Sequence, residues 1–464
     1  MATRMHSLRG KRIHFIGIGG AGMSGLARIA LSEGFNVSGS DAKDSSVVTA
    51  LRVLGAHIDV THDAKHVDGS EVVVFSTAIT SNNVELARAK ELGLEILSRA
   101  QLLSILMSES KSIAVAGTHG KTTTSSMMAV ALQSCGLDPS FAIGGTITAS
   151  GSNAHKGTGS LFVAEADESD GSFVEYHPFA AIVTNIEHDH VDFFATPESV
   201  VDAFNSFVQT INPQGCLVFC NDDAGSRALG EAHSEISRVS YGTTSGSDLL
   251  VDQIELLPMG SRSRVIWRGK SLGKLELRVP GHHNVLNAAS VVAMGLSLDL
   301  DANSILEGLG TFQGTGRRFE LIGTVHGIRV VDDYGHHPTE IAATLEAARR
   351  FAGDGRVIVI FQPHRYSRTK AFITEFAKVL DRADRAVLLE IYAASEAAIK
   401  GISAQLIVDQ MKIGEFIPNF IDATQSLIED AKPGDVILTL GAGDVSSLAP
   451  IIVEGLYKRF SENE

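Results

Sequence analysis

Short apolar runs alternate with segments of helical spacing along almost the whole chain. This alternation is typical of parallel sheets, because a parallel connection needs a crossover of a dozen or more residues that usually contains a helix. At 464 residues the chain is too long for one core. We therefore predict an α/β fold with three units, which span residues 1–106, 107–313 and 314–464.

The apolar runs place the expected strands. The first unit contains the runs IHFIGIG, NVSGSD, EVVVFS and LEILS, and the third contains RVVDDYG, RVIVIFQ, RAVLLEIY and DVILTLGAG. The central unit contains SIAVAG, SLFVAEAD, AAIVTNI and GCLVFCNDD. Residues 249–280 show alternating apolar positions without helical spacing, which predicts antiparallel strands at the far edge of the central sheet.

Composition and charge exclude several classes of protein. The formal net charge of -15 opposes binding to nucleic acid or to an acidic membrane surface. The three cysteines form no C-x-x-C pair, so we expect buried thiols in a reducing cytoplasm. No uninterrupted apolar stretch of about 18 residues predicts a membrane helix. Glycines interrupt the apolar run after the basic start, which argues against a secretory signal. The sequence does not distinguish a monomer from a homodimer.

A glycine-rich turn at residues 17–22 fits the pattern G-x-G-x-x-G between a strand and a helix. Such a turn allows the backbone and a helix N-terminus to approach a pyrophosphate. Asp41 ends the second strand at about the spacing expected for a carboxylate on a ribose hydroxyl. Three interpretations of this turn stay open: it binds a dinucleotide, it binds a UDP-sugar, or it is a structural turn without a ligand. The candidate residues are Gly17, Gly19, Gly20, Gly22 and Asp41.

A second glycine turn, GTHGKTT, gives the stronger signal. Backbone N–H groups of such a loop cradle phosphates, while Lys121 reaches the outer phosphates and the Thr122 hydroxyl can bind magnesium. Val115 stands where the first glycine of the standard P-loop belongs, so the loop is a shorter variant. The predicted ATP-binding loop comprises Gly117, Thr118, His119, Gly120, Lys121, Thr122 and Thr123.

Carboxylates and histidines follow the next two strands. The first group is Glu165, Asp167, Glu168 and Asp170, and the second is His188, Asp189, His190 and Asp192. Carboxylate oxygens beside a phosphate loop are the ligands that magnesium prefers. The alternatives are an exposed acidic loop and a solvated turn. A zinc site lacks a convincing third and fourth ligand, so we expect magnesium sites near ATP.

Two later stretches complete the predicted ATP site. His283, Asn284 and Asn287 begin a helix, where they can meet a base edge or a phosphate. Arg317 and Arg318 lie at the junction of the second and third units, where domain closure could bring a guanidinium to the γ-phosphate. A salt bridge between the units is the competing role for these arginines.

The third unit carries a basic pocket. Loops after neighbouring parallel strands converge on one crevice, which brings together Tyr334, His336, Arg365 and Arg368. Such a group suits a small carboxylate, whereas surface arginines are the alternative. His336 is also our candidate for the base that deprotonates an attacking amine.

These motifs together resemble the Mur ligase family. The resemblance rests on GIGGAGMSG, AGTHGKTTT, EADESDGSF, TNIEHDHVD, HHNVLNA, GRRFE, DDYGHHPTE and FQPHRYSRT, which follow in the order of the family over nearly the whole chain. The resemblance implies an N-terminal Rossmann-like domain for a UDP-sugar, a central P-loop ATPase domain with a mostly parallel sheet, and a C-terminal Rossmann-like domain for an amino acid. It also implies an acyl-phosphate intermediate and the cofactors ATP and Mg²⁺.

Residue roles follow from the same resemblance. It implies that Thr122, Glu165 and His190 bind magnesium, and that Lys121 and an arginine, Arg318 or Arg317, stabilise the transferring phosphoryl group. His283 and Asn287 would lie at the base of ATP. The alanine pocket would be formed by Tyr334, His336, Arg365 and Arg368.

The last two motifs resemble the branch of the family that joins L-alanine to UDP-N-acetylmuramate in peptidoglycan synthesis. Several sister ligases resemble one another in a carbamylated lysine, and residues 197–211 contain no lysine here. A ligase that recycles a murein tripeptide is the nearer alternative. A nicotinamide-dependent oxidoreductase is the alternative from another class, but it would leave the phosphate loop and the third unit without a task.

Overall fold

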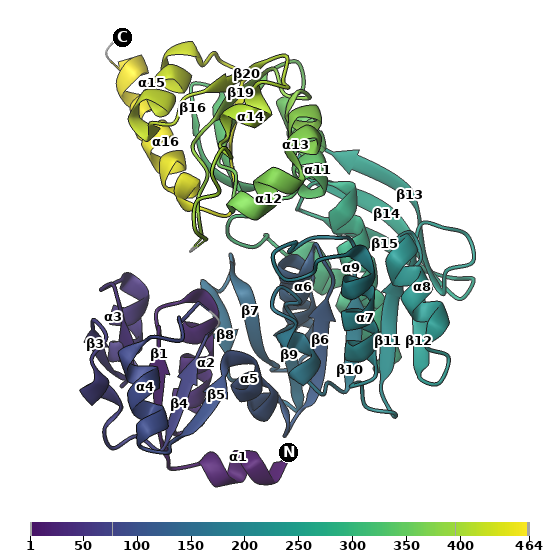
Figure 1. Ribbon diagram of the computed structural model, residues 1–464. Helices are drawn as coiled ribbons and strands as arrows, with labels where there is room; N and C mark the ends of the chain where they lie inside the picture. The colour runs from purple at the N-terminus through teal and green to yellow at the C-terminus, as the bar shows by residue number, and fades with distance from the viewer. Residues whose placement is uncertain (1, 77, 395, 462–464) are drawn as a thin grey trace.

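The computed structural model describes residues 2–76, 78–394 and 396–461, and it contains three sheets (Figure 1). Their strand orders are β3-β2-β1-β4-β5, β15-β14-β13-β12-β11-β10-β6-β9-β7-β8, and β16-β17-β21-β18-β19-β20. The sheets occupy successive parts of the chain, as the alternation of strands and helices predicted. The exact unit boundaries at 106 and 313 stay predictions.

The N-terminal sheet is parallel throughout. Its strands are β1 (Arg12–Ile16), β2 (Asn36–Asp41), β3 (His57–Val60), β4 (Val72–Phe75) and β5 (Glu95–Ser98). Its helices are α1 (Ala2–Leu8), α2 (Ala21–Ser32), α3 (Ser46–Val53), η1 (Ala64–Val67), α4 (Val84–Glu91) and α5 (Arg99–Met107). The central position of β1 directs the turn at 17–20 to the carboxyl edge of the sheet, where ligands of open α/β sheets bind.

The central sheet is mostly parallel, with antiparallel strands at both edges. Its strands are β6 (Lys111–Ala116), β7 (Ser140–Ile147), β8 (Ser152–His155), β9 (Leu161–Glu165), β10 (Ala180–Val183), β11 (Cys216–Cys220), β12 (Ser237–Gly242), β13 (Leu249–Leu257), β14 (Gly260–Trp267) and β15 (Lys270–Leu277). The antiparallel edge β13–β15 confirms the prediction for residues 249–280. The helices are α6 (Lys121–Ser134), η2 (Ser172–Glu175), α7 (Pro197–Val208), α8 (Ala224–Ala232), α9 (His282–Ser297) and α10 (Ala302–Thr311).

The C-terminal sheet has one antiparallel edge strand, β16, and is otherwise parallel. Its strands are β16 (Glu320–Val325), β17 (Ile328–Asp333), β18 (Val357–Phe361), β19 (Arg385–Leu388), β20 (Gly414–Phe416) and β21 (Val436–Leu440). The helices are α11 (Pro338–Ala352), α12 (Tyr366–Ala371), α13 (Ile373–Leu380), α14 (Gln405–Val408), α15 (Phe420–Asp430), η3 (Asp444–Ser447) and α16 (Leu448–Ser461).

The three units meet around the carboxyl edge of the central sheet (Figure 1). The buried apolar residues of the N-terminal sheet are continuous with those on one face of the central sheet. Helix α2 lies so close to β8 that a Cβ at Gly25 would be 3.2 Å from the Cβ of Ala154. No helix in the described part of the chain is long and apolar enough to cross a membrane.

Candidate functional site

The phosphate loop joins β6 to α6 and has a backbone that requires glycine at two positions. Gly117 has φ +131°, and a Cβ there would be 2.0 Å from the Thr184 hydroxyl oxygen. Gly120, the N-cap of α6, has φ +83°, and a Cβ there would be 2.7 Å from Oδ1 of Asn287. Both positions therefore combine a left-handed backbone with a close neighbour, so a side chain would distort the loop.

Lys121 is held over the loop before any substrate arrives. Its Nζ donates to the carbonyl of Gly117 at 2.8 Å, to that of Thr118 at 3.2 Å and to Oε2 of Glu168 at 2.7 Å. Burial lowers the pKa of Lys121, but the carboxylates of Glu168 and Asp167 outweigh burial and raise it above its usual value. The ammonium therefore stays charged, as stabilisation of a phosphoryl group requires.

The predicted metal ligands lie in two neighbouring groups. Thr122 donates its hydroxyl to Oε1 of Glu165 at 3.0 Å, and the N–H of Gly144 donates to Oε2 of Glu165 at 2.7 Å. His190 lies instead with two other acids, and one ligand atom each from Asp167, Glu168 and His190 fall within 4.8 Å of one another.

Asp167 and Glu168 belong to the acidic stretch that the sequence predicted near magnesium, but neither is among the ligands that the family resemblance implied. Burial and the neighbouring Asp167 raise the pKa of Glu168 to about 7, against the lowering effect of Lys121. Oε1 of Glu168 and Nδ1 of His190 are buried without a hydrogen-bond partner. A carboxylate oxygen and an imidazole nitrogen that lack hydrogen-bond partners beside a phosphate loop fit a divalent cation, provided that the nitrogen is unprotonated. The sequence signal for Glu168 as a metal ligand was its position in the acidic stretch after β9.

The remaining polar residues of the loop after β10 have other partners. Asp189 accepts from Nε and Nη2 of Arg368 at 2.9 and 3.1 Å, and Asp192 pairs with Arg365. His188 contacts the carbonyl of Phe194 at 3.0 Å. Of the second predicted group, the structure therefore brings only His190 to the acids beside the phosphate loop.

Thr184 and Asn185, at the end of β10, hold the phosphate loop, a role that the sequence analysis missed. The Thr184 hydroxyl donates to the carbonyl of His119 at 2.6 Å. The amide of Asn185 accepts from the His119 N–H at 2.8 Å and donates to the His119 carbonyl at 3.0 Å. The dipeptide directly follows an apolar strand parallel to β6, which was the available signal.

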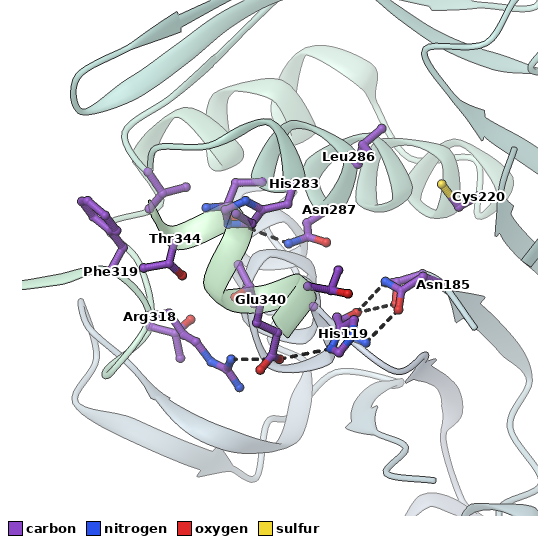
Figure 2. Close-up of a pocket in the computed structure, with 18 of the residues that line it drawn as sticks. His119, Asn185, Cys220, His283, Leu286, Asn287, Arg318, Phe319, Glu340 and Thr344 are labelled. Atoms are coloured by element: carbon purple, nitrogen blue, oxygen red, sulfur yellow. Dashed lines mark hydrogen bonds and ion pairs between the residues drawn. The ribbon is translucent and has the colours of Figure 1, made fainter. Parts of the chain in front are cut away.

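A cavity of about 310 Å³ lies between the central and C-terminal units (Figure 2). It adjoins the phosphate loop and contains the predicted base-contact residues His283 and Asn287. Arg318 also lines the cavity, whereas the Arg317 guanidinium bonds to Asp332 and to the carbonyl of Gly441. The geometry therefore favours Arg318 over Arg317 as the arginine that faces a nucleotide.

A second cavity of about 310 Å³ lies between the N-terminal and central units. Gly20 and Gly22 line one side, Glu165 and Asp167 the other, and Arg99 lies with them. The sequence analysis missed Arg99, because a lone arginine at a helix start carries no motif. A Cβ on Gly22 would be 3.1 Å from Cδ of Arg99, so the glycine gives this side chain its space.

Asp41 lies at the glycine turn of the N-terminal unit. Its Oδ2 accepts from the Gly19 N–H at 2.8 Å. The N–H groups of Gly17 and Ile18 both donate to the carbonyl of Ser40, at 2.8 and 3.0 Å. In this structure the aspartate thus holds an amide that a pyrophosphate would otherwise use.

The four residues predicted for the amino-acid pocket follow β17 and β18 in the C-terminal unit. The Tyr334 ring contacts Arg317 and Arg318, and its centroid is 5.3 Å from that of His336. His364 continues the chain of contacts, with its ring 5.8 Å from His336 and its Nδ1 3.3 Å from Nη1 of Arg368. Arg365 lies nearer the surface, so the four predicted residues line one face whose two arginines pair with central-unit aspartates.

His336 is a neutral imidazole in this environment. Burial lowers its pKa to about 3. Its Nδ1 lies 3.0 Å from the carbonyl of Tyr334, which places the proton on Nδ1 and leaves Nε2 as the acceptor. A neutral ring can accept a proton, but the low pKa makes it a weak base.

Family models match all three units. The Mur ligase family catalytic domain matches residues 12–111, the Mur ligase middle domain residues 115–295, and the Mur ligase glutamate ligase domain residues 317–443. Among curated proteins, a UDP-N-acetylmuramate–L-alanine ligase of Paenarthrobacter aurescens is 47% identical over 448 residues, covering 96% of this chain and 97% of that protein. One from Mycobacterium sp. strain JLS is 46% identical and covers 97% and 96%.

Solved structures show the same likeness. A UDP-N-acetylmuramate–alanine ligase from Thermotoga maritima is 30% identical with a TM-score of 0.82, covering 98% of this chain and 100% of that one. A murein peptide ligase from Psychrobacter arcticus is 26% identical with a TM-score of 0.73, covering 96% and 99%. With all three domain models matched in order and relatives aligned over nearly their full length, this chain belongs to the Mur ligase family.

Proposed function

We propose that this protein joins L-alanine to the lactyl carboxylate of UDP-N-acetylmuramate, with hydrolysis of ATP to ADP and phosphate. The observation that carries the proposal is the position of the phosphate loop between two cavities. One cavity is lined by the glycine turn of the N-terminal unit and by Glu165, which accepts from Thr122 of the loop. The other is lined by His119 and Gly120 of the loop and by residues of the C-terminal unit such as Arg318. The near full-length likeness to alanine ligases supports this choice of substrates.

The division of labour among the units follows from these cavities. We assign UDP-sugar binding to residues 1–106, ATP binding to 107–313 and alanine binding to 314–464. Gly17, Gly19, Gly20 and Gly22 would face the pyrophosphate, with Asp41 at the uridine end. Because the reaction consumes ATP, we place it in the cytoplasm, with small molecules as its substrates.

The chemistry begins with a carboxylate that resists amines, because its leaving group would be oxide. Transfer of the γ-phosphoryl group of ATP converts this carboxylate to an acyl phosphate, whose leaving group is phosphate. Lys121 and Arg318 would stabilise the charge that develops on the transferring group. Magnesium held by Thr122, Glu165, Glu168 and His190 would neutralise phosphate charge when bound.

The second step is attack of the neutral amine of alanine on the acyl phosphate. Arg365 and Arg368 would orient the alanine carboxylate, and His336 would accept a proton from the amine at Nε2. Closure of the C-terminal unit over the phosphate loop excludes water from the acyl phosphate. Positioning of three substrates across three units is therefore the main contribution of the protein.

The decisive assay measures ADP release with each substrate omitted in turn. We expect release only when ATP, UDP-N-acetylmuramate and L-alanine are all present, with amide product in equal amount. Release driven by the murein tripeptide in place of alanine would assign the recycling reaction instead. Absorbance change of a nicotinamide cofactor would overturn the whole proposal.

Gly19→Ala should weaken binding of the UDP-sugar without affecting that of ATP. A Cβ on Gly19 would lie 2.9 Å from Oδ2 of Asp41 and 3.1 Å from Cγ2 of Val48, so the turn must shift. We expect the Kd for UDP-N-acetylmuramate to rise about tenfold or more, since a misplaced turn loses its contacts to the ligand. Titration calorimetry with each ligand checks this. Gly34→Ala, in a left-handed turn with open space, is the matched control on the same unit.

A further inference from the structure

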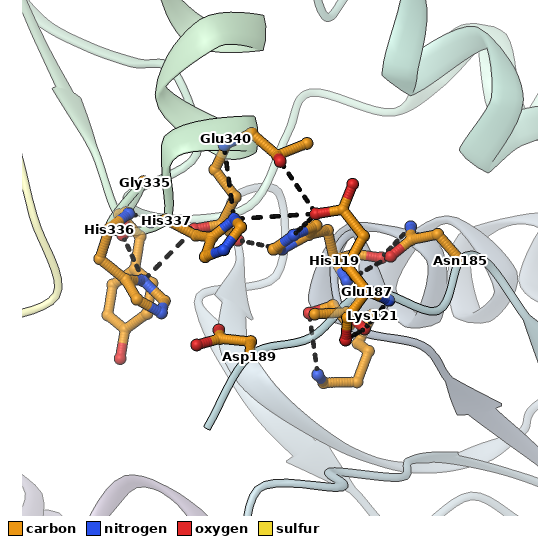
Figure 3. A network of polar contacts seen from close by, with 12 residues as sticks. His119, Lys121, Asn185, Glu187, Asp189, Gly335, His336, His337 and Glu340 are labelled. Atoms are coloured by element: carbon orange, nitrogen blue, oxygen red, sulfur yellow. Dashed lines mark hydrogen bonds and ion pairs between the residues drawn. The ribbon is translucent and has the colours of Figure 1, made fainter. Parts of the chain in front are cut away.

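The side chain of His119, in the phosphate loop, points toward Glu340 and His337 of the C-terminal unit (Figure 3). Its Nε2 lies 3.0 Å from Oε2 of Glu187 in the central unit. Its Nδ1 lies 3.2 Å from Oε1 of Glu340 in α11 of the C-terminal unit. Both ring nitrogens are thus used by carboxylates, and the ring bridges two units rather than facing a phosphate.

Glu340 also contacts two residues to which we assign roles in the reaction, His336 and Arg318. Its Oε2 accepts from the N–H of His336 at 3.0 Å, and its Oε1 lies 3.9 Å from Nη1 of Arg318. It also forms a capping box with His337 at the start of α11. One carboxylate therefore connects the phosphate loop, the arginine that lines the nucleotide cavity and the backbone of the candidate base.

The charge of His119 follows from the groups that face it, which are Glu187, Glu340 and the ring of His337 at a centroid distance of 4.9 Å. Burial lowers the pKa of His119, but the bonds to the two carboxylates outweigh burial and raise it to about 9. At neutral pH the ring is an imidazolium that donates from both nitrogens.

We propose that His119 is a positioning residue: its bridge to Glu340 couples the placement of the C-terminal unit to the phosphate loop, and so sets Arg318 toward the γ-phosphate and His336 toward the attacking amine. The bridge joins a central-unit loop to a C-terminal-unit helix, so it depends on how these two units meet. This inference rests on the proposed ligase function.

A double-mutant cycle on His119→Gln and Glu340→Gln tests the coupling. Each single variant should lower kcat at least about tenfold, because a loosened closure misplaces the reacting groups. KM for UDP-N-acetylmuramate should change less than twofold. The double variant should match Glu340→Gln within about twofold, because the bridge is already broken in the single variant. Losses that multiply in the double variant, or single variants with wild-type kcat, would overturn the proposal.

Glu346→Gln supplies the matched control. It is the same substitution on the same helix, and Glu346 pairs only with the exposed Arg350 at i+4 among the ion pairs of the described residues. We expect wild-type kcat for this variant. Thermal unfolding of every variant separates a loss of fold from a loss of positioning. A His119→Gln chain that unfolds early is replaced in the cycle by His119→Asn, which is also uncharged.

The pH dependence gives a second, independent readout. Because the bridge raises the pKa of His119 from 6.5 to about 9, its contribution is complete below pH 6.5 and is lost as pH rises through about 9. The cycle should therefore show strong coupling at pH 7 and little at pH 10. His119→Lys keeps a charge to a higher pH, so it should retain part of the activity at both. Equal coupling at both pH values would show that charge on His119 is not the cause.

Failure of the proposed function gives a different result. If wild-type protein released no ADP with alanine and the UDP-sugar, the ligase assignment would fall. If wild-type protein is active and the two substitutions act independently, only the positioning role of His119 falls.

Discussion

Lys121→Ala is expected to abolish ligation while the protein still binds its UDP-sugar. The substitution removes the buried ammonium that lies over the phosphate loop, 2.7 Å from Glu168 and 2.8 Å from the carbonyl of Gly117. Loss of one preorganised group that stabilises transition-state charge lowers a rate by about 10²–10³-fold, and Lys121 is placed to act on ATP binding as well. We therefore expect kcat/KM to fall by about 10³-fold or more.

Coupled measurement of ADP release checks the rate, and calorimetry checks the two affinities. The Kd for UDP-N-acetylmuramate should stay within about twofold of wild type, because the glycine turn at 17–20 belongs to another sheet. Lys111→Ala is the matched control, since Lys111 begins β6, the strand before the phosphate loop, and its ammonium lies over the Phe179 ring. A collapse of sugar affinity in Lys121→Ala would mean that the ligand sites are wrongly divided between the units.

Strands with a clear apolar run or a clear alternation could be predicted from the sequence, whereas two short edge strands could not. Strands such as β11 and β18 are buried at every residue and therefore appear as continuous apolar runs. In contrast, β3 and β20 are short edge strands with few buried side chains. Their pairing is decided by the neighbouring strand, so no local pattern identifies them.

The same distinction applies to the candidate site. Gly117, Gly120 and Lys121 are found from sequence because one turn of backbone imposes their spacing. The contact between His119 and Glu340 depends on how two units meet, which no local pattern encodes. The arginine pocket could be predicted in part. Its residues follow strands of the C-terminal sheet, which a sequence pattern can show, but their aspartate partners come from the central unit, which it cannot.

The second large effect is expected at Arg368, whose aspartate partner in the central unit is Asp189. Arg368→Met should raise KM for L-alanine about 100-fold and leave the Kd values for ATP and the UDP-sugar within about twofold. Arg368 is 3% exposed and binds Asp189 through two nitrogens, which is the geometry that also suits the carboxylate of an amino acid. Removing a bidentate charged partner from a closed site costs about 3 kcal/mol, which corresponds to this change in affinity.

Arg382→Met is the control for this experiment, because Arg382 is an exposed arginine of the same unit. Steady-state kinetics with varied alanine distinguishes a role of Arg368 in binding alanine from a structural role in holding the C-terminal unit to Asp189. If Arg368 only tied the C-terminal unit to Asp189, its loss would lower kcat with every substrate saturating and leave KM for alanine unchanged. Asp192→Asn tests the other arginine of the pocket, because it removes the charged partner of Arg365. If the alanine carboxylate competes with Asp192 for Arg365, KM for alanine should fall in this variant.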